Sequence, residues 1–164
     1  MKNVLKIIII GIICFLVSKY IFSLCVVHGN SMSPTLKDKQ IVFETKIVTK
    51  INYNDIVVIK KGNLKIIKRI VGKPKDKLII KNNYLYVNGK KYNDIFIENA
   101  GNLNELLILN DNEYFALGDN INNSIDSRDN KIGVIKINEI KGKIIKWLIL
   151  FFYKIKMCYY IVVS

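Results

Sequence analysis

Residues 64–72 read Leu-Lys-Ile-Ile-Lys-Arg-Ile-Val-Gly, a run rich in the β-branched side chains that favour a β-strand. Side chains alternate between the two faces of a strand, so Leu64, Ile66, Lys68 and Ile70 share one face. Lys68 is then the only charge on an otherwise apolar face. Periodicity alone favours an ordinary lysine that reaches solvent at the sheet edge. The alternative is a buried lysine, whose pKa burial would lower.

Short apolar runs of the same kind lie on both sides of this stretch, separated by Asn, Gly, Lys and Asp. The dipeptide Asn88-Gly89 is a strong signal for a two-residue β-hairpin turn. Residues 100–109 fit either one short helix or a loop with a strand. The spacing predicts one mainly β, antiparallel domain over residues 28–145. The runs expected as strands are 41–43, 56–59, 64–71, 78–80, 84–87, 114–117 and 132–137.

An apolar run occupies residues 7–27 at the N-terminus. A helix of that length spans about 32 Å, enough for a hydrocarbon core of about 30 Å. Lys2 and Lys6 precede the run and predict a cytoplasmic N-terminus. A cleaved signal peptide is the alternative, but its apolar region is normally shorter, and Ser23 and Cys25 make a poor cleavage site. We therefore expect residues 1–27 to hold an uncleaved, single transmembrane anchor.

The last segment, residues 146–164, is an apolar tail interrupted by Lys154 and Lys156. Its uninterrupted apolar stretches, 147–153 and 157–163, are too short to cross a bilayer. We expect a tail that lies against the protein or the membrane surface, with a second transmembrane helix as the alternative.

Composition excludes several classes of protein. The chain has 164 residues, of which 51% are hydrophobic, too many for a disordered protein. Lys and Arg number 26 against 13 Asp and Glu, but they are scattered without aromatic stacking motifs, so no nucleic-acid partner is expected. Three cysteines and one histidine make a disulfide scaffold or a zinc site improbable. Neither a metal nor a cofactor is expected.

Two further stretches carry groups capable of chemistry. Residues 29–36 read Gly-Asn-Ser-Met-Ser-Pro-Thr-Leu, and residues 118–128 contain Gly-Asp-Asn followed by Ser-Ile-Asp-Ser-Arg. Serine is a poor nucleophile unless a base takes its proton, and a buried lysine with a lowered pKa is such a base. His28 is a rival base close to Ser31, and Asp119 with Asp126 is a weaker alternative as a carboxylate pair.

Together with the lysine stretch 68–76, these two stretches in this order behind an anchor resemble bacterial type I signal peptidases. The resemblance covers about residues 1–145 and implies a barrel-like antiparallel catalytic domain that uses a Ser-Lys dyad. By this resemblance Ser31 is the nucleophile and Lys68 the general base. It further implies that Ser124 orients Lys68, that the Ser31 N–H and the position of Gly29 serve the oxyanion, that Asp119, Asp126 and Arg128 support the site, and that Met32, Ile66 and Ile67 line the substrate pocket.

The implied function is removal of signal peptides from exported preproteins, with the catalytic domain outside the cell membrane and in contact with its lipid. One alternative is a dedicated processing protease for a single pilin-like, conjugation or secretion substrate. Another is a non-enzymatic, membrane-anchored binding domain, in which Ser31 and Lys68 would be dispensable.

Overall fold

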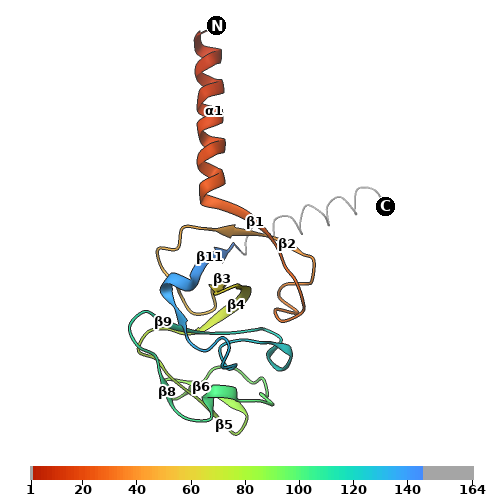
Figure 1. Ribbon diagram of the computed structural model, residues 1–164, viewed down its shortest axis with the longest axis vertical. Coiled ribbons are helices and arrows are strands. Elements are labelled where there is room, and N and C mark those ends of the chain that lie inside the picture. The colour runs from red at the N-terminus through yellow and green to blue at the C-terminus, as the bar shows by residue number, and fades with distance from the viewer. Residues whose placement is uncertain (1, 146–164) are drawn as a thin grey trace, which may run out of the picture.

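The computed structural model describes residues 2–145 of the chain. Helix α1 (Lys2–Ile21) projects from a β-rich body and continues without a linker into strand β1 (Phe22–Val26) (Figure 1). The backbone N–H of Lys46 donates to the Ile21 carbonyl at 2.8 Å, which holds the helix end against the body. Within residues 2–145, no helix is both long enough and apolar enough to cross a membrane.

The apolar run of residues 7–27 is not helical throughout, which differs from the sequence prediction. The helix ends at Ile21, and the five residues of β1 pair antiparallel with β2 (Ile41–Thr45), from Phe22 opposite Thr45 to Val26 opposite Ile41. Every second side chain of β1 is half-buried, as a strand at a sheet surface requires. Cross-strand hydrogen bonds with β2 replace those that a longer helix would have made. The C-terminal tail of residues 146–164 lies outside the described residues.

The larger sheet has seven strands in the order β1-β2-β11-β3-β4-β9-β10, and every pairing is antiparallel. This confirms the mainly β, antiparallel prediction. The barrel is not closed, because β1 and β10 are the two edges and do not pair with each other in the described chain. The remaining strands are β3 (Ile56–Lys61), β4 (Leu64–Gly72), β9 (Glu113–Leu117), β10 (Ile135–Lys136) and β11 (Ile140–Ile144).

A smaller sheet of four strands, in the order β7-β6-β5-β8, packs below the larger one (Figure 1). Asn88 and Gly89 form its predicted hairpin turn, with the positive φ angles of 53° and 77° that such a turn needs. The ambiguous residues 100–109 form a 3-10 turn (Gly101–Leu103) followed by a two-residue strand. The strands of the smaller sheet are β5 (Lys77–Lys81), β6 (Tyr84–Val87), β7 (Lys90–Lys91) and β8 (Leu107–Ile108). Two further 3-10 turns, Ile121–Asn123 and Ile137–Glu139, follow later in the chain.

Strand β3 is buried on both faces, so its apolar side chains are continuous rather than alternating. On one face, Val57 and Ile59 join a core that includes Ile70 of β4. On the other face, Ile56 and Val58 pack with residues of the loop between β1 and β2. A third core fills the space between the two sheets; its fully buried members include Leu78, Leu85, Ile97, Leu103, Leu109 and Phe115. The β1–β2 loop is therefore fastened to the larger sheet.

A buried carboxylate joins the two sheets. Asp76, only 6% exposed, follows β4 and accepts hydrogen bonds from the Tyr53 hydroxyl, the Lys73 N–H and the Asn88 side chain at 2.7–2.9 Å. Tyr53 precedes the larger sheet's strand β3, and Asn88 lies in the hairpin of the smaller sheet. The burial of Tyr53 and its hydrogen bond to Asp76 raise the pKa of the phenol to about 12.

Candidate active site

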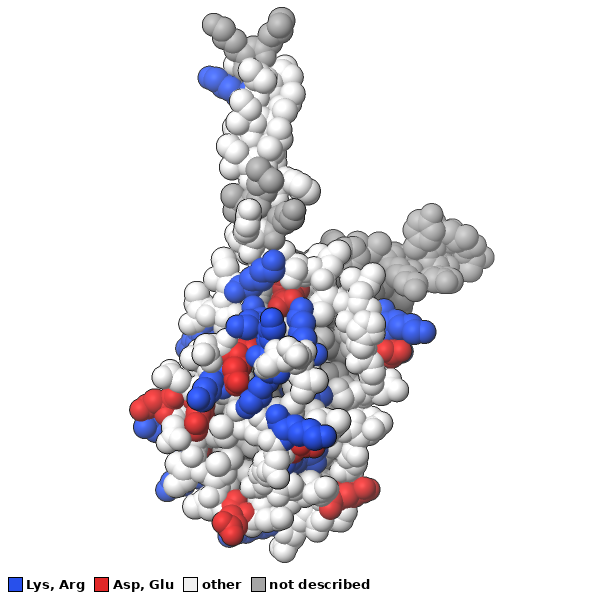
Figure 2. Space-filling view, viewed as in Figure 1, with Lys and Arg blue, Asp and Glu red and all other residues white. Residues whose placement is uncertain are grey.

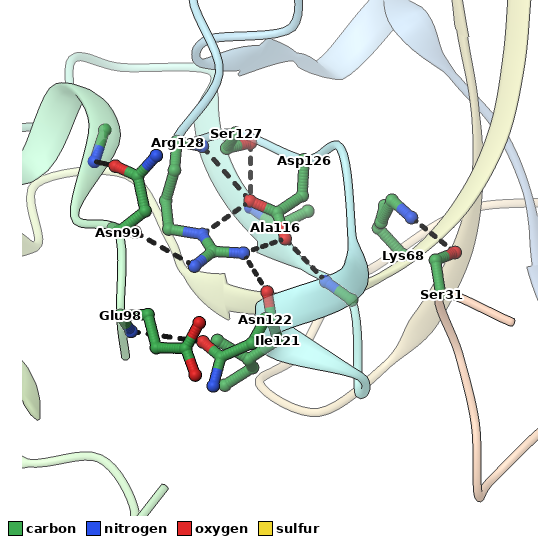
Figure 3. Close-up of polar contacts among 12 residues, drawn as sticks. Ser31, Lys68, Glu98, Asn99, Ala116, Ile121, Asn122, Asp126, Ser127 and Arg128 are labelled. Atoms are coloured by element: carbon green, nitrogen blue, oxygen red, sulfur yellow. Dashed lines mark hydrogen bonds and ion pairs between the residues drawn. The ribbon is translucent and has the colours of Figure 1, made fainter. Parts of the chain in front are cut away.

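Ser31 and Lys68 meet at the surface of the larger sheet (Figure 3). The Lys68 Nζ atom lies 2.7 Å from Ser31 Oγ and donates a hydrogen bond to it. Ser31 belongs to the β1–β2 loop, which is fixed because the next residue, Met32, is 1% exposed and Leu36 is fully buried. Lys68 comes from β4 and is only 3% exposed, so it does not extend to solvent along the sheet edge. A hydroxyl and an amine are thus held at hydrogen-bonding distance by two separate parts of the fold.

Burial lowers the pKa of Lys68 from 10.5 to about 8. The negative charges of Asp126 and Asp119 oppose this lowering, and the positive charge of Arg128 adds to it. An amine with a pKa near 8 is neutral in a substantial fraction of molecules at mildly alkaline pH. In that neutral form Lys68 has a lone pair with which to accept the Ser31 proton, as a general base must.

Asp126 and Arg128 form a buried ion pair beside the dyad (Figure 3). They are 1% and 7% exposed. Asp126 Oδ1 accepts from Arg128 Nε at 2.9 Å, and its Oδ2 accepts from the Gly118 N–H at 3.1 Å. Ser127 Oγ also accepts from the Ala116 N–H at 3.1 Å. The loop that follows β9 is therefore fastened back onto β9.

Asp119 has a different arginine, which the sequence did not indicate. Its Oδ1 accepts from Arg69 Nε at 2.6 Å, and Arg69 follows Lys68 directly on β4 with its side chain on the opposite face. The next residue, Asn120, donates its backbone N–H to the Ser31 carbonyl at 3.0 Å. Asp119 therefore links the stretch 118–128 to β4, and Asn120 links it to the β1–β2 loop. Because each carboxylate has its own arginine, Asp119 and Asp126 do not form a carboxylate pair.

The other candidate groups are less well placed. Among the described residues, no hydrogen bond joins His28 to Ser31, so His28 is not positioned as the base. Residues 2–145 contain no group of three or more His, Cys, Asp or Glu side chains able to hold a metal ion.

A family model described as signal peptidase, peptidase S26, matches residues 1–148. The chain belongs to the signal peptidase family. This confirms the resemblance inferred from the three motifs, and it makes the chain a serine endopeptidase of the type I signal peptidase kind, an enzyme that removes signal peptides.

Curated relatives agree with this membership. Signal peptidase I S of Bacillus subtilis (strain 168) is 34% identical over 153 residues, which cover 83% of this chain and 82% of that protein. A signal peptidase I of Bacillus amyloliquefaciens is 36% identical over 156 residues, covering 84% and 79%. A crystal structure of a signal peptidase I from Enterococcus faecalis V583 superposes with a TM-score of 0.47 at 21% identity, covering 59% of this chain and 98% of that one.

Ser124 departs from what the signal peptidase resemblance implied. We expected its hydroxyl to hydrogen-bond Lys68, yet Ser124 Oγ is buried without a hydrogen-bond partner among the described residues. The hydroxyl instead lies over the backbone of Gly118, where an added Cβ would be 2.2 Å from Ser124 Oγ and 2.6 Å from the Ser31 carbonyl oxygen. Gly118 is therefore required by the close approach of the nucleophile loop and Ser124.

The two backbone N–H groups near the expected oxyanion position, those of Gly29 and Ser31, differ in whether they already donate a hydrogen bond. The Gly29 N–H already donates to Asp38 Oδ1 at 2.7 Å, so it is not available to a substrate oxygen. Gly29 has no side-chain donor, and its φ of 81° favours glycine. Within residues 2–145, no group accepts a hydrogen bond from the Ser31 N–H. Of these two expected donors, only the Ser31 N–H is free to donate to a substrate oxygen beside the Ser31 hydroxyl.

A groove of about 240 Å³ leads away from the dyad between β1 and β4. The three residues expected in the substrate pocket, Met32, Ile66 and Ile67, line it. Strand β4 pairs with β9 only from Arg69 onward, so the edge of residues 64–68 has no strand partner on that side in the described chain. The groove therefore combines apolar walls with unpaired backbone groups. Its full lining is Cys25, Val26, Val27, His28, Ser31, Met32, Lys65, Ile66, Ile67 and Lys68.

Proposed function

We propose that Ser31 and Lys68 are the catalytic dyad with which this member of the signal peptidase family cleaves its substrates. The observation that carries the proposal is the 2.7 Å contact between Ser31 Oγ and the buried Lys68 Nζ. Neutral Lys68 takes the Ser31 proton while Oγ attacks the carbonyl carbon of the scissile bond. The Ser31 N–H donates to the oxyanion that forms.

The protonated Lys68 then gives its proton to the leaving amine, which departs as the new N-terminus. The signal peptide stays bound to Ser31 as an ester. A water molecule attacks this ester while Lys68 again accepts a proton, and the released Oγ recovers a proton from Lys68. The products are a peptide carboxylate and the regenerated dyad.

We further propose that the substrate binds as an added strand on the open edge of residues 64–68. Unpaired backbone groups on a sheet edge are a template for an extended peptide, and pockets beside the edge select its side chains. Ile66, Ile67 and Met32 line the groove at this edge, and they give it an apolar wall that suits small side chains before the cut bond.

Helix α1 is proposed as the single membrane anchor, with a cytoplasmic N-terminus and an extracytoplasmic catalytic domain. Apolar side chains of α1 are exposed, for example Ile7 at 70% and Phe15 at 71%. The apolar side chains Phe22, Leu24 and Val26 of β1 continue this surface with exposures of 43%, 65% and 46%. Lys and Arg side chains, with some Asp and Glu among them, gather on the part of the visible face nearest the helix (Figure 2). The catalytic domain then begins at β1 rather than at residue 28.

Substitution of the nucleophile tests the dyad. The full chain in detergent is incubated with a preprotein, and the new N-terminus of the product is sequenced. Ser31→Ala should abolish cleavage without unfolding the protein, because the neighbouring Met32 and Leu36 hold the loop. Ser33→Ala, in the same loop, is the matched control and should cleave normally. Full activity in Ser31→Ala would refute the assignment of the nucleophile.

A further inference from the structure

Lys65 stands at the end of the groove away from the dyad. It lies three residues before Lys68 on β4, and its side chain is 56% exposed. Its Nζ atom is 3.8 Å from Glu44 Oε2, although β11 and β3 separate β2 from β4 in the sheet. The sheet therefore curls far enough to bring a β2 side chain over this end of the groove.

The Glu44 side chain is buried and held in place by its neighbours. Its side chain is 5% exposed and accepts a hydrogen bond from Ser23 Oγ of β1 at 3.1 Å. Gly142 of β11 leaves room for the carboxylate, since a Cβ there would be 2.4 Å from Glu44 Oε1. The carboxylate is thus held by Ser23 of β1 in the space beside Gly142 of β11, and it attracts the Lys65 ammonium.

The charges at this end of the groove do not cancel. Lys60 of β3 is directly opposite Lys65 in the β3–β4 register, so the two exposed lysines share one face. Lys60 therefore adds a second positive charge to the face on which Lys65 approaches the largely buried Glu44 carboxylate. Because Lys65 is the member that lines the groove, the excess positive charge is presented to whatever occupies it.

From these contacts we infer that Lys65, held by Glu44, forms a charge-selective subsite that favours an acidic residue and disfavours a basic residue in the substrate, three to five positions before the cut bond. This inference rests on the proposed binding of the substrate along β4. The position follows from the proposed placement of the substrate. With the cut bond at Lys68 and the residues before it beside Ile67 and Ile66, the substrate runs parallel to β4, so each residue toward its N-terminus lies about one residue back along the open edge. Lys65 is three residues back.

The test uses the full chain in detergent and a preprotein whose cleavage depends on Ser31. Asp, Asn or Lys is placed in turn at the third, fourth and fifth positions before the cut. At one of these positions we expect kcat/KM to fall in the order Asp, Asn, Lys, with about a fivefold difference between Asp and Lys, the size expected for exposed charge pairs. The difference should shrink in about 1 M salt, where the Debye length is about 3 Å.

Substitutions in the enzyme identify the group responsible. Lys65→Met should bring the ratio of kcat/KM between the Asp and Lys substrates close to one, and Lys65→Glu should make the Lys substrate the better one. Lys81→Met, at an exposed lysine of the smaller sheet, is the matched control and should retain the ratio. An unchanged ratio in Lys65→Met, or no ratio at any of the three positions, would overturn the inference while leaving the peptidase assignment intact. Failure to cleave even the Asn substrates would instead count against the proposed function.

Discussion

Replacing Lys68 with methionine should make the protein more stable at neutral pH while abolishing its activity. The folded protein keeps this amine 3% exposed, and burial lowers its pKa from 10.5 to about 8. By linkage, that lowering means that holding the charged amine inside the fold costs about 3 kcal/mol. Methionine keeps the length and apolarity of the side chain and removes the charge. The variant also loses the hydrogen bond to Ser31, which lowers its stability by about 1 kcal/mol. We therefore expect its free energy of unfolding to exceed that of the wild type by about 2 kcal/mol.

The pH dependence of this gain is specific. Below pH 8 Lys68 is protonated in both the folded and the unfolded chain, so the wild type bears the whole cost. Between pH 8 and 10.5 the folded lysine is neutral while the unfolded one still binds a proton, so wild-type stability rises relative to the variant. Above pH 10.5 the cost is gone. The advantage of Lys68→Met should therefore be largest at pH 7, fall to zero at pH ~9.5, and reverse to a deficit of about 1 kcal/mol above pH 10.5, where only the lost hydrogen bond remains.

Urea unfolding of both proteins in the same detergent, followed by far-UV circular dichroism at pH 7, 8, 9 and 10, measures the difference. Lys81→Met is the matched control, because that lysine is exposed and should show no pH-dependent gain. Equal or lower stability of Lys68→Met at pH 7, or a difference that does not change with pH, would refute the argument that desolvation controls this lysine.

Three further outcomes are expected. Wild-type kcat/KM should rise about tenfold from pH 7 to 9 and level off above, because the neutral fraction of Lys68 rises from about 9% to about 91% around a pKa of about 8; a rate still climbing at pH 10 would contradict this. Gly118→Ala should lose most activity in the preprotein assay, because its Cβ would be 2.6 Å from the Ser31 carbonyl oxygen. Arg128→Leu should lower the free energy of unfolding by about 3–5 kcal/mol in urea titrations, because it leaves Asp126 buried without its partner; a loss below 1 kcal/mol would argue against the supporting role.

The alternation of side chains in residues 64–72 was sufficient to single out Lys68. It placed one charge among apolar neighbours, and the structure has that charge buried. The choice between a buried and an exposed lysine needed information from elsewhere in the chain, because the groups around the amine, Ser31, Asp126 and Arg128, come from other segments. The hairpin at Asn88-Gly89 was predictable for a different reason: its turn is determined by the two residues themselves.

Other features depended on long-range pairing and were missed. Residues 22–26 are apolar whether they end a helix or form a strand, so periodicity could not separate the two. Only β2, about 20 residues later, determines that they are a strand. Likewise, the partner of Asp119 is Arg69, 50 residues away, and no local pattern indicates it. The run of residues 132–137 was expected to be one strand, but only Ile135–Lys136 pairs, since a 3-10 turn begins at Ile137.

Helix α1 runs directly into strand β1, so we expect the helix and the larger sheet to move together. No hinge residue separates Ile21 from Phe22, and the Lys46 N–H ties the helix end to the strand that pairs with β1. With α1 as the proposed membrane anchor, the sheet would hold Ser31 at a set height above the bilayer. A change in bilayer thickness would tilt the helix and move the dyad with it, so the depth at which a preprotein presents its cleavage site would become part of substrate selection.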